Sequence, residues 1–278
     1  MLDQTATAIL PPRQRVSARA AVSFGRRDGR TVLGRLAQQG SAKAMLPRVH
    51  RAVPELVFLN TAGGLTGGDV IGFDLQLAAG TRVVATTQTA ERAYGSLADL
   101  PPARLDVTAD LAAGAHLDWL PQETILFDRA ALHRRTEIRL VGDATCLLAE
   151  CVVLGRAAMG ETVRQLDFRD SRMVRRDGHP VLYEPLRIAT AQLATRNRPA
   201  GLGDARAFAT IALVAVWAPD RAAALRPLMQ AEGIRAAVSG WDGRLVIRAL
   251  GAHPHHLRRW MAAVLTELRG PLPRVWTI

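Results

Sequence analysis

The chain has 278 residues, of which 49% are apolar and 22% charged, and this balance excludes a disordered protein because it can bury a full core. Its 36 basic and 25 acidic residues give a net charge of +11, which favours an acidic protein, nucleic acid or anionic membrane as a partner without choosing among them. Two cysteines exclude a disulfide-rich secreted scaffold and predict a reducing cytoplasm.

The first two thirds of the chain, from residue 15 to about 190, have the pattern of short β-strands separated by turns. Turn signals include Arg27-Asp28-Gly29, Ala79-Gly80, Ala113-Gly114 and Asp177-Gly178. The predicted strands are Val16 to Phe24, Leu56 to Leu59, Val70 to Leu77, Arg82 to Thr89, Arg104 to Val107, His116 to Leu120, Leu132 to Leu140 and Thr145 to Leu154. Because no helix between them is long enough to cross over, we expect mainly β structure in layered antiparallel sheets.

The C-terminal part has a different pattern, with about two helices. A buried strand over Phe208 to Trp217 precedes a helix over Pro219 to Glu232, which Pro227 should break. Two strands then flank Trp241-Asp242-Gly243, and His255 to Leu268 predicts an amphipathic helix.

The predicted organisation is one domain over 1–278, with a β-rich body (15–194), a loop or linker (195–205) and a C-terminal β/α lobe (206–278). The N-terminus lacks the apolar segment of a signal peptide. The longest nearly apolar run, Ala207 to Ala218, is too short for a membrane span, which needs about 20 residues. We therefore expect a soluble cytoplasmic protein.

The densest motif is the glycine-rich segment Asn60 to Asp69, which contains Gly63, Gly64, Gly67 and Gly68. Nucleotide binding is excluded because Asp69 stands where a phosphate loop needs Lys, and because no frame fits the dinucleotide fingerprint. Two alternatives stay open: a structural double turn, or a loop that presents Asp69.

Metal ligation is the next possibility. Cys146 and Glu150 should share one face of a strand and Cys151 the other, which argues against a thiolate pair. His253, His255 and His256 could bind nickel weakly through imidazole, or could simply be the solvated start of a helix. No catalytic set of nucleophile and base emerges.

Several carboxylates stand in distinctive local contexts. Asp69, Glu150, Glu161 and Asp177 could together line a polar passage for a hydrated cation, although lone carboxylates more often solvate a surface or stabilise a turn. Transient oxygen ligation would release a metal easily, as a carrier requires.

An ordered set of motifs is similar to the UreD (UreH) family of urease accessory proteins. The resemblance runs from about Val16 onward and departs from the family where Arg92 replaces the usual Lys. Its motifs are Asn60 to Leu65 with Gly67-Gly68-Asp69, Thr86-Thr87-Gln88, Leu120-Pro121-Gln122 with Thr124 to Phe127, Glu150, Leu154-Gly155-Arg156 with Met159-Gly160-Glu161, and Arg176-Asp177-Gly178.

This resemblance implies a β-rich chaperone without catalytic activity and without a permanently bound cofactor. It also implies a cytoplasmic complex with a helical UreF-type protein and a UreG-type GTPase, which docks on apo-urease and delivers nickel. In that interpretation nickel passes transiently through this chain, with Asp69, Glu150, Glu161 and Asp177 as candidate lining residues.

Two other functions compete with this interpretation. A basic nucleic-acid-binding protein would explain the charge, but aromatic residues for base stacking are scarce at 5% and the arginines are dispersed. A β-sandwich hydrolase would need a convergent nucleophile and base, which the sequence does not indicate.

Overall fold

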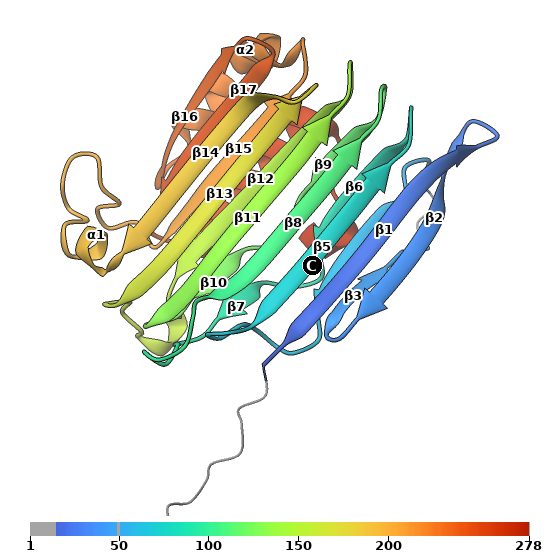
Figure 1. Cartoon of the computed structure of the whole chain (residues 1–278). Coiled ribbons are helices and arrows are strands. Elements are labelled where there is room, and N and C mark those ends of the chain that lie inside the picture. Colours follow the sequence, from blue (N-terminus) through green and yellow to red (C-terminus); the bar gives the residue numbers. More distant parts are fainter. Residues whose placement is uncertain (1–14, 49–50, 278) are drawn as a thin grey trace, which may run out of the picture.

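The computed structural model describes residues 15–48 and 51–277, and these form two β-sheets packed face to face (Figure 1). The first sheet has seven strands, and its outer face is solvated. Their order is β14 (His179–Ala189), β13 (Leu166–Arg176), β11 (Ala130–Leu140), β8 (Ala103–Leu111), β5 (Val70–Leu77), β1 (Ser17–Arg27) and β2 (Arg30–Gln39).

The second sheet has ten strands and includes those of the C-terminal part. Its main path runs through β16 (Ile234–Trp241), β17 (Arg244–Gly251), β15 (Ala207–Val214), β12 (Thr145–Leu154), β9 (His116–Trp119), β6 (Arg82–Thr87), β4 (Glu55–Asn60) and β3 (Ala42–Met45). Off this path, β10 (Thr124–Leu126) pairs with β12, and β7 (Glu91–Ala93) pairs with β10. Because β15 pairs with β12, the C-terminal strands extend the same sheet.

Mainly β structure in layered sheets is confirmed, but the expectation of antiparallel pairing was wrong for the central strands. In the first sheet, β1, β5, β8, β11 and β13 are all parallel, and only the two edge strands pair antiparallel. In the second sheet, β4, β6, β9 and β12 are parallel. The physical reason is that the crossover between parallel neighbours is a strand of the opposite sheet, so no helix is needed.

Short turns at one end of the sandwich carry the chain from the first sheet to the second, and successive turns stack. Gly80, Gly114 and Gly142 adopt positive φ in these turns. Gly80 N–H donates to the Ala113 carbonyl of the next turn at 3.0 Å, and Gly142 N–H donates to Asp177 Oδ1 at 2.9 Å. The fold is thus a short stack of coils that ends in the β13–β14 hairpin.

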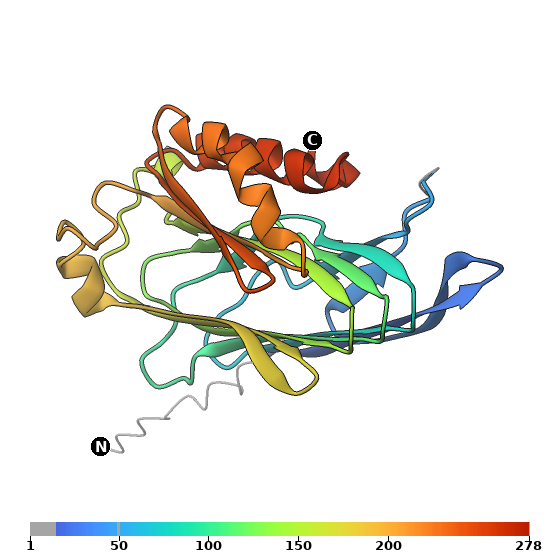
Figure 2. The same ribbon diagram turned by 90° about the horizontal axis from the view of Figure 1, so that it is seen from above.

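Two hydrophobic cores result. One lies between the sheets and includes Phe58, Phe73 and Phe168. The other lies between the outer face of the ten-stranded sheet and the helices that cover it (Figure 2). The second core is held by α3 (Pro254–Arg269), through Leu257, Met261, Val264 and Leu265.

The two helices predicted in the C-terminal part lie where they were expected, but only one of them is continuous. The α3 prediction is confirmed within one residue at each end. The segment that contains Pro227 is broken, as expected, into η2 (Ala218–Arg221), α2 (Ala222–Leu225) and η3 (Arg226–Gln230). Smaller helices are η1 (Ala157–Met159), α1 (Thr190–Ala194) and η4 (Arg274–Trp276). None of the helices in the described ranges is long and apolar enough to cross a membrane.

Candidate functional site

Four charged side chains lie in the interior between the two sheets: Arg134, Glu150, Asp170 and Arg172. Strand alternation places Arg134 of β11, and Asp170 and Arg172 of β13, on the inward face. Glu150 of β12 faces them from the other sheet. Each is at most 5% exposed, and with two cations and two anions the group is neutral. We call these four residues the ion network.

Arg134 is the centre of the ion network. Its Nε and Nη2 donate to the two oxygens of Asp170 at 3.0 and 2.7 Å, and its Nη1 lies 2.7 Å from Glu150 Oε2. Nη1 also donates to Thr124 Oγ1 at 2.9 Å. Trp119 Nε1 donates to the other oxygen of Glu150 at 3.0 Å. The guanidinium therefore joins both sheets through charge-assisted hydrogen bonds.

The same burial acts differently on the two acids. Burial raises the pKa of Glu150 above its usual value, and the charge of Arg134 offsets only part of that rise. Burial would also raise the pKa of Asp170, but the adjacent charges of Arg134 and Arg172 lower it below its usual value. Glu150 is thus the less firmly ionised of the two, since it has one ion-pair partner where Asp170 has two.

The four carboxylates proposed from sequence do not meet in one place. Asp69 directly precedes β5, and Asp177 directly follows β13, so the two lie at opposite ends of the seven-stranded sheet. The length of a strand separates these ends, and β5 has 8 residues. Glu161 lies in the loop before β13. Only Glu150 faces the interior between the sheets.

The other three carboxylates hold loops in place. Asp69 accepts the Val16 and Thr66 backbone N–H groups, both at 2.8 Å. Glu161 accepts the Asp128 N–H at 3.1 Å and the Arg156 N–H at 3.0 Å; burial opposes ionisation, but Arg156 lowers the pKa of the acid.

The glycine-rich loop packs against the segment that contains Arg92 and Ser96. Leu65 N–H donates to the Arg92 carbonyl at 2.7 Å, and a side chain at Gly67 would collide with Ser96. Gly63, Gly64 and Gly68 have positive φ. Asp69 is 4% exposed and points back into the loop. These contacts favour the structural alternative.

The histidine and cysteine candidates also lie apart. His253, His255 and His256 are exposed at the start of α3, and the rings of His253 and His256 are 5.2 Å apart. Cys146 belongs to the core between the sheets and Cys151 to the core under α3. Burial raises the pKa of the Cys146 thiol to about 12. Within residues 15–48 and 51–277, no cluster of three His, Cys, Asp or Glu has the arrangement of a metal site.

Sequence reasoning missed Arg134, Asp170 and Arg172, although a signal was present. Within the predicted strand Leu132 to Leu140, alternate residues from Leu132 onward are buried. Arg134 then falls on the same face as Leu132, where a charge requires a buried partner. A charged residue at an inward strand position was therefore the overlooked clue.

Glu91 is a titratable group near the glycine-rich loop. It lies against a small cavity of about 60 Å³ and accepts the Asn60 amide at 3.2 and 3.3 Å. Burial raises its pKa to about 7, and the Asn60 and Arg92 contacts oppose that rise.

We expect Glu91→Gln to stabilise the protein at pH 8 by about 3 kcal/mol and to leave it unchanged near pH 4.5. The reason is that the pKa of Glu91 in the folded state exceeds its ordinary value of 4.5. Ionisation above pH 7 therefore costs stability, and this cost disappears as the pH falls toward 4.5. Urea unfolding of both proteins between pH 4.5 and 8 checks this; a pH-independent difference would contradict it.

Taken together, two sheets packed around a neutral ion network define a β-scaffold protein. The model of the UreD urease accessory protein family matches residues 16–277. The chain is 52% identical over 273 residues to the urease accessory protein UreD of Cereibacter sphaeroides strain ATCC 17025, with 97% of this chain and 98% of the relative covered. UreD of Dinoroseobacter shibae is 51% identical over 276 residues (98% and 95%), and that of Jannaschia sp. is 45% identical over 280 residues (100% of each).

The chain therefore belongs to the UreD urease accessory protein family. It is an accessory protein and not an enzyme. The resemblance found in the sequence motifs is confirmed.

Proposed function

We propose that this chain assists urease maturation by helping nickel pass from a UreG-type GTPase to apo-urease. It would do so in a cytoplasmic complex that also contains a UreF-type protein. The observation that carries the proposal is the family match over residues 16–277. Nickel is cargo here and not a resident cofactor.

The ion network supports Glu150 as the interior ligand for passing nickel. Its carboxylate lies between the sheets and has a single ion-pair partner, Arg134. A divalent cation could bind Glu150 only by displacing that guanidinium, so the carboxylate would hold the metal weakly and release it readily. Asp69, Glu161 and Asp177 accept backbone N–H groups. We therefore propose that they hold in place the loops at the two ends of any passage.

The outer face of the seven-stranded sheet gives no support to nucleic-acid binding. Several of its arginines are paired with acids across neighbouring strands, as in Arg19 with Asp74 at 2.5 Å and Arg139 with Asp110 at 2.8 Å. Paired guanidinium groups leave little free positive charge for phosphates.

The test is nickel loading of urease. A urease operon is expressed with and without this chain at equal nickel supply, and the nickel content and activity of purified urease are measured. We expect folded urease without nickel when the chain is absent. Unchanged loading would contradict the proposal.

A second arm tests Glu150 separately. We expect Glu150→Gln, which keeps an acceptor for Trp119, to lower the nickel content of urease severalfold. Asp110→Asn is the matched control, because Asp110 is half-exposed on the outer face and pairs with Arg139. Equal loading with both variants would remove Glu150 from the route without affecting the proposed role of the chain.

A further inference from the structure

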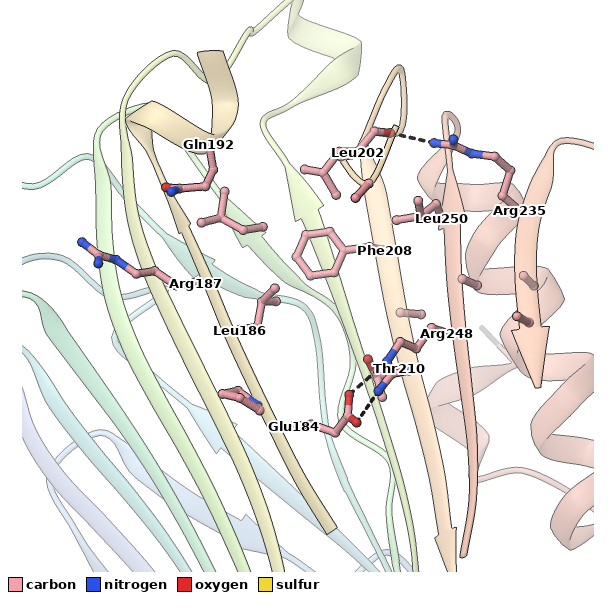
Figure 3. Close-up of a pocket in the computed structure, with 18 of the residues that line it drawn as sticks. Glu184, Leu186, Arg187, Gln192, Leu202, Phe208, Thr210, Arg235, Arg248 and Leu250 are labelled. Atoms are coloured by element: carbon pink, nitrogen blue, oxygen red, sulfur yellow. Dashed lines mark hydrogen bonds and ion pairs between the residues drawn. The ribbon is translucent and has the colours of Figure 1, made fainter. Parts of the chain in front are cut away.

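A groove of about 890 Å³ opens at one edge of the sandwich, between β14 and the inner face of β15, β17 and β16 (Figure 3). Here the ten-stranded sheet continues past the last strand of the seven-stranded sheet, so part of its inner face is not covered by a partner strand. The loop after α1 closes one end of the groove. Near the other end, Glu184 of β14 pairs with Arg248 of β17 at 2.5 Å.

The lining of the groove combines an apolar floor with a cationic rim. The floor includes Leu186, Phe208 and Leu250. Five arginines and one acid are among the described residues that line the groove; the acid is Glu184, and the arginines are Arg172, Arg187, Arg198, Arg235 and Arg248. Glu184 is neutralised by Arg248, and Arg172 belongs to the neutral ion network. The excess positive charge of the groove therefore comes from Arg198 and Arg235, with Arg187 at its border.

Arg172 is among the residues that line this groove and is 3% exposed. Its Nε is 3.5 Å from Asp170 Oδ2 and, within the part of the chain that the structure describes, has no hydrogen-bond partner. The oxygens of Asp170 already accept from Arg134. A guanidinium carries five N–H donors, and buried donors require acceptors. A carboxylate that entered the groove would offer this guanidinium an acceptor.

The shape of the groove favours an extended chain over a small ligand. Six consecutive residues of β14, Tyr183 to Ile188, border it, and at about 3.3 Å per residue they span roughly 20 Å. That length suits about six residues of extended peptide. Pro185 has no N–H, so the β14 edge is an interrupted template for strand addition, and recognition must rest on side chains.

We propose that this groove binds an extended, acidic segment of a partner protein, with apolar side chains on the floor and one carboxylate paired with Arg172. Acid groups flanking that carboxylate would meet the arginines of the rim. The net charge of +11 would speed the encounter with an acidic partner. The proposal does not depend on nickel passage.

Fluorescence anisotropy of labelled hexapeptides on the full-length chain tests the proposal. The probes are a peptide that alternates Glu and Leu, and a peptide that alternates Lys and Leu. We expect saturable binding of the Glu/Leu peptide only. Arg172→Met should weaken it at least about tenfold, because a buried charge pair is lost.

Arg169→Met is the matched control: it lies on the same strand but points outward, with its side chain 54% exposed, and should bind as the wild type does. The double variant Arg198→Glu/Arg235→Glu changes two exposed residues of the groove without touching the core, and it too should weaken binding strongly. That variant decides the matter if Arg172→Met fails to fold.

Three results would overturn the proposal. The Glu/Leu peptide fails to bind, or it binds the rim double variant as it binds the wild type. The third result is that octanoate displaces the peptide at a concentration equal to the Kd of the peptide. The groove would then be a site for small carboxylates and not for a partner segment.

Discussion

Arg134→Met is expected to lower the free energy of unfolding by about 3–5 kcal/mol, the usual effect of removing one partner from a buried ion pair. Methionine fills much of the same space, so the loss would come from charge and hydrogen bonding more than from a cavity. Glu150 would lose its ion-pair partner, and Asp170 would keep only the 3.5 Å contact with Arg172. Urea unfolding at pH 7 measures the effect.

The control for this prediction is Arg139→Met on the same strand. Arg139 is half-exposed and pairs with Asp110 and Glu137 on the outer face, so its loss should change stability by no more than about 1 kcal/mol.

The deficit of Arg134→Met should also depend on pH. Arg134 lowers the pKa of both acids in the folded state. Without it, the raised pKa of Glu150 should rise further and the lowered pKa of Asp170 should rise, so ionisation of Glu150 in particular destabilises the fold at neutral pH. Protonation relieves that cost, and the deficit should shrink as the pH falls from 7 to 5. A small, pH-independent loss would show that the ion network contributes little to stability.

Gly64→Ala is expected to destabilise the protein by about 2–4 kcal/mol, because strain from positive φ adds to a steric clash. Gly64 has φ +151°, and an added Cβ would lie 2.7 Å from the Arg92 carbonyl oxygen and collide with the Tyr94 ring. Backbone cannot move aside as a flexible side chain can. Thermal unfolding followed by circular dichroism measures the change.

The neighbouring glycine provides the control for that change. Gly63 has φ +80° and open space around its added Cβ, so Gly63→Ala should cost only the backbone strain, about 1 kcal/mol. Equal losses at Gly63 and Gly64 would mean that close packing against Arg92 has no role.

Local patterns predicted individual elements well and their pairing poorly. The bounds of β5 and β12 agree with the predicted strands, and the turns at Gly80, Gly114 and Asp177-Gly178 lie where expected. Three long strands, β2, β13 and β14, were missed, as were the short strands β3, β7 and β10. In β2 no residue is fully buried, so its apolar periodicity is weak.

The coil arrangement had a sequence signal that was not recognised. Leu77 to Val83 (Leu-Ala-Ala-Gly-Thr-Arg-Val) and Leu111 to Leu117 (Leu-Ala-Ala-Gly-Ala-His-Leu) repeat one pattern, and both make the turn between the sheets. Pairing between coils depends on residues about 30 positions apart, which local alternation does not reveal.

The candidate site could be predicted only in part for the same reason. Glu150 could be placed on an inward face with Cys146 from spacing alone. Its partner Arg134 comes from the opposite sheet, and the contact exists only because the two sheets pack face to face. The groove likewise depends on the unequal widths of the sheets, which no single segment encodes.

The ten-stranded sheet is apolar on both faces, and this has a consequence for synthesis of the chain. The outward residues of β12, among them Leu147 and Val153, are covered by a helix that lies more than 100 residues later in the chain. During translation the N-terminal coils emerge and can fold first, while this apolar surface stays exposed until α3 has been synthesised. The nascent chain therefore passes through an aggregation-prone stage. That stage ends when α3 packs on the sheet.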